Sequence, residues 1–278
     1  MEYFTLNNEV KMPALGFGTY KIEDREECER SIRDALNSGY RLFDTARFYR
    51  NEDFIGKTLA ESGIKREDLF LTTKLWPGEF ENATAAVEDS LKNLRTDYLD
   101  MVLLHWPYGN IYKAWRELEK LNEAGIIRCI GVSNFNSDRL IDLITFNRVV
   151  PAVNQVEANV WCQRRPEAEW HQKYGVLMQA YAPMGRCRPA EFFEDPVLKE
   201  IAAAHGKSVR QIMLRFLMQI GIAVIPKSVH TERIAENFNV FDFTLNSGEM
   251  EALAKLDLND PVIGKPQDPQ RAYNLTHC

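Results

Sequence analysis

Cysteine is scarce in this chain and is not arranged to bind a metal or to build a disulfide framework. Its five cysteines are Cys28, Cys129, Cys162, Cys187 and Cys278, an odd and widely scattered set with no C-x-x-C pair. This spacing lacks the pattern of a structural zinc site and argues against a secreted, disulfide-stapled fold. We therefore expect no metal site and a reducing compartment.

The chain also lacks the segments that direct proteins to a membrane. Its first residues contain no basic segment followed by an apolar run, and nowhere does the sequence reach the roughly 18 consecutive apolar residues of a membrane-spanning helix. These absences predict no signal peptide and no contact with a membrane. A cytoplasmic location is the resulting expectation.

No block of like charge is present, although 34 basic and 40 acidic residues give a net charge of −6. This balance argues against nucleic acid or an anionic membrane as the main partner. The 278 residues, of which 45% are hydrophobic, are enough to bury a large core, and the composition excludes disordered and collagen-like proteins. Length alone allows one domain or two.

Short apolar or β-branched runs alternate with amphipathic stretches from about residue 14 to about residue 237, which is the pattern of repeated βα units. Strands are predicted at 14–17, 41–43, 69–73, 99–104, 127–132, 152–156, 176–180 and 222–225. Covering helices are predicted at 25–36, 83–94, 111–124 and 208–218 among others. Eight parallel strands is the number that closes a barrel.

We therefore predict an α/β fold, a (β/α)8 or TIM barrel with an N-terminal β-hairpin and an extra C-terminal helix. The hairpin is expected from segments 3–6 and 9–12, joined by two asparagines, as a plug for the bottom of the barrel. No glycine- or serine-rich linker interrupts the series, so one domain over 1–278 is favoured. The competing architecture is a doubly wound open sheet, but segment 16–21 lacks the third glycine of the G-x-G-x-x-G motif.

In such a barrel the active site lies at the carboxyl ends of the strands. Reactive side chains follow the apolar runs there: Asp44, Tyr49, Lys74, His105, Ser133, Asn134, Gln155, Tyr181, Lys227 and Ser228. Taken alone, each of these residues could instead have a structural role. Asp44 could cap the N-terminus of a helix, and His105 could be a core histidine whose hydrogen bonds are all made within the protein. The coincidence of four ionisable or phenolic groups from adjacent strands favours function, because a buried Lys and Asp are costly unless paired.

Five motifs at these strand ends resemble the aldo-keto reductase family, in the right order and over nearly the whole chain. They are Phe43-Asp44-Thr45-Ala46-Arg47-Phe48-Tyr49, Thr73-Lys74-Leu75-Trp76, Leu104-His105-Trp106-Pro107, Gly131-Val132-Ser133-Asn134-Phe135 and Ile225-Pro226-Lys227-Ser228. The resemblance implies a catalytic tetrad of Asp44, Tyr49, Lys74 and His105. It also implies a monomer that reduces a small-molecule carbonyl substrate, with NADPH bound across the barrel mouth. The pattern is most similar to the microbial 2,5-diketogluconate and glyoxal reductase type.

The tetrad has a chemical logic of its own. Hydride transfer to a carbonyl leaves negative charge on oxygen, so the site needs a donor that protonates it. A phenol has a pKa of about 10, and we expect the Lys74 ammonium to lower the pKa of Tyr49 while Asp44 holds the lysine. His105 is expected to be neutral and to orient the carbonyl.

The later strands are expected to bind the cofactor. By resemblance, Ser133, Asn134 and Gln155 bond the nicotinamide carboxamide and Tyr181 stacks on its ring, although Asn134 has the alternative of a helix N-cap. The resemblance assigns Lys227, Ser228 and Arg233 to the 2′-phosphate, with a solvated helix charge as the alternative for Arg233. The remaining cofactor contacts are expected from Gly18, Thr19, Tyr20, Asp44, Val229, Glu236 and Asn237.

The substrate pocket is expected to be apolar and aromatic. Its predicted residues are Tyr20, Tyr49, Trp76, His105 and Trp106, with Phe48, Tyr108 and Trp161 in neighbouring loops. The chain departs from the family where Arg50 replaces a common glycine, which predicts a differently shaped loop and a possible affinity for anions, and where Ala182 replaces a common serine. The tail after the last predicted helix, from about residue 257, is short, so we expect a relatively open site.

Two other functions fit the barrel. A regulatory subunit could keep the cofactor as a redox sensor with little turnover, and a phosphate-handling lyase or isomerase could use Lys74 as a Schiff-base nucleophile. The intact tetrad argues against the first, and the spacing of Tyr49 and His105 argues against the second. The natural carbonyl substrate is not encoded in these motifs, because loop shape selects it.

Overall fold

The computed structural model describes residues 1–276, so Cys278 lies outside the described part of the chain. Its central feature is an eight-stranded sheet in which every neighbouring pair is parallel, in the order β10-β9-β8-β7-β6-β5-β4-β3. The strands are β3 (Gly16–Gly18), β4 (Leu42–Asp44), β5 (Phe70–Leu75), β6 (Leu99–Leu104), β7 (Ile127–Ser133), β8 (Val153–Glu157), β9 (Leu177–Tyr181) and β10 (Ala223–Val224). All eight predicted strands are confirmed, with limits that differ by at most two residues.

The first and last strands meet and close the sheet into a barrel. A parallel bridge joins Leu15 to Val224, and the Val224 N–H donates to the carbonyl of Ala14 at 2.9 Å. The Gly18 N–H adds a bond to the carbonyl of Pro226 at 3.0 Å. The doubly wound open sheet is therefore excluded, and the predicted (β/α)8 barrel is confirmed.

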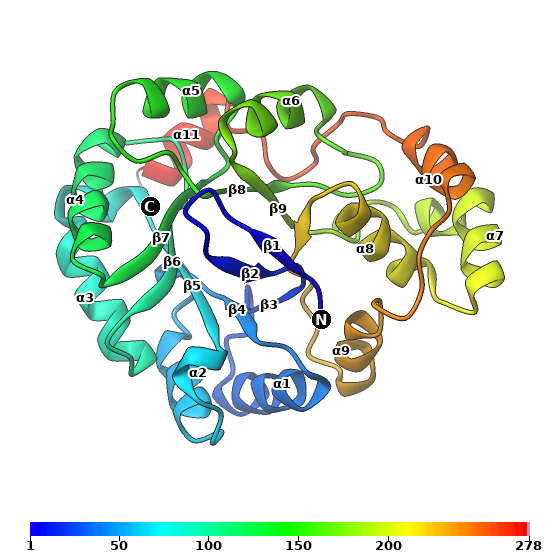
Figure 1. Ribbon diagram of the computed structural model, residues 1–278, viewed down its shortest axis with the longest axis horizontal. Helices are drawn as coiled ribbons and strands as arrows, with labels where there is room; N and C mark the ends of the chain where they lie inside the picture. The colour runs from blue at the N-terminus through cyan, green and yellow to red at the C-terminus, as the bar shows by residue number, and fades with distance from the viewer. Residues whose placement is uncertain (277–278) are drawn as a thin grey trace.

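Helices surround the barrel in chain order (Figure 1). They are α1 (Arg25–Ser38), α2 (Glu52–Ala60), α3 (Ala83–Leu94), α4 (Ile111–Glu123), α5 (Ser137–Thr145), α6 (Arg165–Tyr174), α7 (Pro196–His205), α8 (Val209–Gln219) and α9 (Thr231–Phe238). Side chains such as Trp115 of α4 and Phe216 of α8 are fully buried in the layer between helices and strands. This layer forms because the helices carry apolar residues on one face only.

The N-terminal hairpin lies across one end of the barrel, in front of the strands in Figure 1. It pairs β1 (Tyr3–Thr5) with β2 (Lys11–Pro13) in antiparallel register. Leu6 and Met12 are buried in a cluster with side chains of the barrel interior, including Phe70 and Met101. The predicted hairpin is thus confirmed, and it fills the end of the barrel at which the strands begin.

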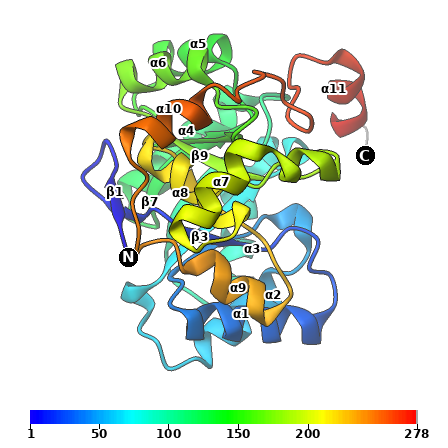
Figure 2. The same ribbon diagram turned by 90° about the vertical axis from the view of Figure 1, so that its right-hand side faces the viewer.

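The chain ends in two helices rather than the one that we predicted. The expected one is α10 (Ser247–Ala254), and α11 (Pro269–Thr276) follows within the segment that we had treated as a tail. Figure 2 shows α11 at the end of the barrel opposite the hairpin. The prediction missed α11 because the helix has only eight residues and most of them are polar, which is too short a stretch for its periodicity to be recognised.

No helix among residues 1–276 is long and apolar enough to cross a membrane.

Candidate active site

A buried ion pair lies at the centre of the barrel mouth. The ammonium of Lys74, which is 0% exposed, donates to Asp44 Oδ1 at 2.5 Å and to the carbonyl of Thr45 at 2.9 Å. The Gln155 amide donates to the other carboxylate oxygen, Oδ2, at 2.7 Å and to Gln179 Oε1 at 2.8 Å. Asp44 therefore accepts from side chains of two other strands, Lys74 of β5 and Gln155 of β8, and does not cap a helix.

Burial and pairing have opposite effects on the pKa values of Asp44 and Lys74. Burial raises the pKa of Asp44 and lowers the pKa of Lys74, because the surroundings disfavour a charge on either group. The opposite charge of the partner and the hydrogen bonds between them favour the charged forms. The charges are therefore stable only together, and each holds the other in a fixed position.

Tyr49 lies beside this pair on a short 3₁₀ turn, Arg47–Tyr49, directly after β4. The Lys74 ammonium is 5.2 Å from the centre of the phenol ring. Burial raises the pKa of Tyr49 well above 10, and the nearby Asp44 charge raises it further. Our expectation of a lowered pKa was wrong, because burial of the phenol and the nearby Asp44 charge outweigh the effect of the Lys74 ammonium. The phenol consequently carries its proton at neutral pH, as a proton donor must.

His105 completes the group from the end of β6. Its ring centre is 5.8 Å from that of Tyr49 and 5.1 Å from that of Trp76, both in edge-on contacts. Burial, together with repulsion from the Lys74 charge, lowers the pKa of His105 well below its usual range. The imidazole is therefore neutral, in agreement with our expectation.

The next strand ends form a connected polar network. Asn134 donates to the carbonyl of His105 at 3.0 Å and to the Ser133 hydroxyl at 3.1 Å, and it accepts from the Tyr181 hydroxyl at 2.7 Å. The Ser133 hydroxyl donates to the carbonyl of Gln155 at 2.9 Å. Asn134 is not a helix cap, because Asn136 occupies that position before α5. Since the side-chain NH2 of Gln155 already donates to Asp44 and Gln179, the side-chain oxygen, Oε1, is the atom of Gln155 that remains for a ligand.

The predicted phosphate-binding residues lie around the start of α9. Lys227 and Arg233 are both exposed, and neither forms an ion pair within residues 1–276. Ser228 is buried and its hydroxyl accepts from the His230 N–H at 3.1 Å. The other predicted cofactor residues here are a half-buried Val229 and Glu236 and a buried Asn237.

The loop that follows β3 lies opposite Lys227, across the barrel seam, which is the line where β3 and β10 meet. Gly18 has no room for a side chain, because an added Cβ would lie 3.0 Å from the carbonyl of Ile225. Thr19 is buried and donates to the carbonyl of Asp44 at 3.0 Å. Tyr20 is 38% exposed, and its ring centre is 4.9 Å from that of Tyr49. The predicted residues of this loop thus lie between the tetrad and the exposed Lys227.

Aromatic rings form one wall of the mouth. Phe48 stacks on Trp76 with ring centres 4.0 Å apart, and Trp106 lies nearly parallel to both His105 and Tyr108. The indole N–H of Trp106 is buried and has no hydrogen-bond partner within the described residues. Trp161 does not belong to this wall, because it packs edge-on against Phe192 and Phe193.

Both family departures occur at strained backbone positions. Arg50 has a φ of 55° and Ala182 a φ of 49°, in the left-handed region that side chains disfavour. We expected Arg50 to reshape the loop after Tyr49, but it adopts the conformation that a glycine would favour. The loop geometry therefore costs backbone strain, on the order of 1 kcal/mol, instead of changing its course.

The C-terminal segment docks onto the site through one buried carboxylate, which the sequence analysis missed. Glu157, at the end of β8, accepts the backbone N–H groups of three successive residues, Val262 to Gly264, at 3.0, 2.6 and 2.7 Å. An added Cβ on Gly264 would lie 2.4 Å from the Tyr181 hydroxyl. We call this arrangement of Glu157 with residues 262–264 the tail latch. A lone acid at a strand end gives no sequence signal for such a role.

Further along, the tail continues over the aromatic wall. The Tyr108 hydroxyl donates to the carbonyl of Pro266 at 2.7 Å, and the Asn136 amide donates to Gln267 at 3.3 Å. The short tail thus covers one side of the mouth, while Tyr20 and Phe48 on the other side stay exposed. How open the site is to substrate remains a prediction.

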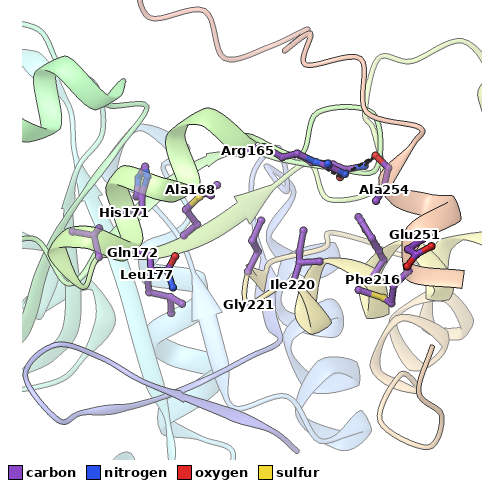
Figure 3. Close-up of a pocket in the computed structure, with 15 residues that line it drawn as sticks. Arg165, Ala168, His171, Gln172, Leu177, Phe216, Ile220, Gly221, Glu251 and Ala254 are labelled. Atoms are coloured by element: carbon purple, nitrogen blue, oxygen red, sulfur yellow. Dashed lines mark hydrogen bonds between the residues drawn. The ribbon is translucent and has the colours of Figure 1, made fainter. Parts of the chain in front are cut away.

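A groove of about 680 Å³ lies elsewhere, on the outside of the barrel between α6, α8 and α10 (Figure 3). Leu177, Phe216 and Ile220 line it, together with His171. Both ring nitrogens of His171 are engaged, by the carbonyl of Glu167 at 2.6 Å and the amide of Asn154 at 2.8 Å. The His171 imidazole is therefore not free to act as an acid or a base in this groove, although the carboxylate of Glu251 also lines it.

A phenol that keeps its proton, beside a buried Lys–Asp pair at the carboxyl ends of parallel strands, makes this an oxidoreductase of the (β/α)8 class. The aldo/keto reductase family model matches residues 14–258, and the chain belongs to that family. It is similar to glyoxal reductase of Bacillus subtilis, with 39% identity over 266 residues and 95% of each chain covered.

Two further relatives illustrate the range of this similarity. Morphine 6-dehydrogenase of Pseudomonas putida is 41% identical over 281 residues, with 95% of this chain and 94% of the relative covered. The crystal structure of an aldo-keto reductase of Bombyx mori in complex with NADP has a TM-score of 0.91 and 31% identity, covering 98% of this chain and 97% of that one. Relatives at about 40% identity thus carry names with very different substrates.

Proposed function

We propose that this chain reduces an aldehyde or a ketone to an alcohol, with NADPH as the hydride donor and Tyr49 as the proton donor. The observation that carries the proposal is the juxtaposition of a protonated phenol, a neutral imidazole and a buried ion pair at one barrel mouth. NADPH supplies the hydride that reaches the carbonyl carbon. Every other step belongs to side chains of this protein.

The substrate carbonyl oxygen sits between Tyr49 and His105. The neutral His105 orients this oxygen and shares its developing negative charge. Tyr49 then transfers its hydroxyl proton to the oxygen, which completes the alcohol. Lys74 offsets the charge left on the phenolate, and Asp44 with Gln155 keeps Lys74 in place. The aromatic wall of Trp76 and Trp106 excludes water and favours an apolar part of the substrate.

The chemistry of the strand ends fits NADPH. The side-chain oxygen of Gln155 can accept from the NH2 group of a primary carboxamide, and Ser133 and Asn134 would exchange a bond that they make within the protein for one to this ligand, with Tyr181 beside them. Lys227 and Arg233 are exposed cations without carboxylate partners in the described chain, near the first turn of α9. Such a pair suits the 2′-phosphate and favours NADPH over NADH.

The decisive experiment compares Tyr49→Phe with the wild type. With methylglyoxal and NADPH we expect the variant to lose at least about 1000-fold in kcat, because no proton donor remains, while its Kd for NADPH changes less than about threefold. Tyr98→Phe is the matched control, since its hydroxyl contacts the carbonyl of Arg66 at 3.4 Å, far from the mouth. Near-normal kcat in Tyr49→Phe would refute the assignment.

A second experiment tests the phosphate clamp. In Arg233→Ala we expect the ratio of kcat/KM for NADPH to that for NADH to fall about 10- to 100-fold, which corresponds to one lost charge-assisted bond. If this ratio is unchanged, Arg233 does not bind the 2′-phosphate and is only a solvent-exposed charge on the helix.

The two rival functions make different predictions in the same assay. Tight NADPH binding without turnover of any aldehyde, ketose or quinone would favour the redox sensor. A Schiff base on Lys74 would be trapped by borohydride, but the ammonium is fully buried and donates to both Asp44 and Thr45. We further propose a cytoplasmic monomer, which cell fractionation and light scattering would test.

A further inference from the structure

Arg271 lies over the aromatic wall of the mouth and has no acidic partner. Its guanidinium carbon is 5.6 Å from the ring centre of Trp106, within the range of a cation–π contact. Within residues 1–276 no carboxylate forms an ion pair with it. Arg164 and Arg188 at this end of the barrel are paired, with Glu167 and Asp260, whereas Arg186, which lies over Tyr20 on the opposite side of the mouth, has no ion pair among residues 1–276.

The position of Arg271 is set by contacts of the segment that precedes it. The tail latch fixes residues 262–264, Tyr108 holds Pro266, and α11 then begins and brings Arg271 back across Trp106. Burial raises the pKa of both Tyr108 and Tyr181, and the charge of Arg271 lowers the pKa of each. The guanidinium therefore lies close to both phenols. Two acids also lie near these phenols, and both accept backbone N–H groups: Asp268 from Gln270 at 2.9 Å, and Glu157 in the tail latch.

From Arg271 the aromatic wall leads directly to the reacting groups. Trp106 is 7% exposed and lies nearly parallel to His105, with ring centres 6.5 Å apart. A substrate whose carbonyl lies at Tyr49 and His105 would extend along Trp106 toward the guanidinium. Arg271 is itself half-buried beside this apolar wall, so a charge–charge contact with it is screened less than at an open surface.

We propose that Arg271 binds an anionic group of the substrate, so that this enzyme prefers aldehydes or ketones that carry a carboxylate or a phosphate a few bonds from the carbonyl. The proposal rests on the carbonyl reduction proposed above and adds the substrate class. An arginine suits this task because its planar donors match a carboxylate or phosphate in a two-bond contact. The net charge of −6 offers no general attraction for anions, so the preference would come from this local site.

The test compares matched substrates in wild type and Arg271→Gln. Butanal and 4-oxobutanoate differ by one carboxylate, and glyceraldehyde and its 3-phosphate differ by one phosphate. In the variant we expect kcat/KM for the anionic member of a pair to fall about 10- to 100-fold, mainly through KM, while that for the neutral member changes less than about twofold. The pair that responds identifies whether a carboxylate or a phosphate is recognised.

Two further variants separate recognition from structure. Lys265→Gln removes a cation from the same tail, 3.5 Å from Asp260 and away from the wall, and should change neither member of a pair. Glu157→Gln weakens the tail latch and should reduce the anionic preference in part, with Arg271 still present. Equal loss for neutral and anionic substrates in Arg271→Gln would overturn the proposal, as would an anionic preference that survives intact.

A binding readout distinguishes failure of this proposal from failure of the proposed function. Binding of 4-oxobutanoate and butanal can be followed through tryptophan fluorescence in the complex with NADP⁺, which has no hydride to transfer and therefore cannot reduce them. If no carbonyl is reduced, the proposed function fails, but tighter binding of 4-oxobutanoate that is lost in Arg271→Gln would still support the anion site. Equal affinity of both ligands for wild type would refute it.

Discussion

The buried pair of Asp44 and Lys74 permits a quantitative test of how this site is held together. At a separation of 2.5 Å and an effective dielectric constant of about 20, two unit charges attract by about 7 kcal/mol. Removing both charges from water costs several kcal/mol per ion, so most of this attraction is offset. The pair therefore adds little net stability, whereas either charge alone would be strongly destabilising.

We expect Lys74→Met and Asp44→Leu each to lower the free energy of unfolding by about 3–5 kcal/mol, because each leaves one buried charge unpaired. The double variant should lose only about 2 kcal/mol, chiefly from the Thr45 carbonyl and the Gln155 amide that lose a partner. Urea titrations of the four proteins at pH 7 measure the coupling.

A surface pair provides the control for this cycle. Lys113 and Glu81 are 3.0 Å apart with side chains 44% and 61% exposed, and their coupling should stay below about 1 kcal/mol. If the double variant of the buried pair loses as much as the two single variants together, the two charges are not coupled. The assumption that Asp44 holds Lys74 would then be refuted.

Two further predictions concern packing and pH. Gly56→Ala should lower the free energy of unfolding by about 1–3 kcal/mol, because the new Cβ would lie 2.3 Å from the carbonyl of Asn93, whereas Gly78→Ala meets no atom within 4 Å and should be neutral within about 0.5 kcal/mol. Equal thermal shifts in the two variants would contradict this. The lowered pKa of His105 means that below pH 6.5 the unfolded chain binds a proton that the folded chain does not, so stability falls as the pH drops. Between pH 7 and 5.5 the wild type should lose about 1 kcal/mol more than His105→Asn in urea titrations, and parallel pH profiles would refute the neutral assignment.

The strand ends could be predicted from the sequence because each apolar run stops at a polar residue. Lys74 follows such a run at the end of β5, and His105 follows the run that forms β6. The parallel barrel then brings these positions together without any knowledge of side-chain packing. This is why the predicted tetrad residues lie close to one another in the structure.

Properties that depend on burial or on distant backbone atoms could not be predicted in this way. The raised pKa of Tyr49 follows from its surroundings, which no local pattern reveals. Glu157 differs in no sequence feature from other acids, yet it binds the backbone of residues more than 100 positions away. Arg271 likewise acquires its place over Trp106 only because that backbone is held.

The barrel seam, where β3 meets β10, joins the N- and C-terminal parts of the chain. The seam rests on the bridge between Leu15 and Val224 and on a last strand of two residues. Gly18 and Lys227 continue from its two sides, so a molecule that spans both would join the two ends of the ring. Because these ends are more than 200 residues apart, the seam closes against a large loss of chain entropy. Cofactor supply in the cell would thereby protect the ring from opening, and local hydrogen exchange at Val224 would slow as the cofactor concentration rises.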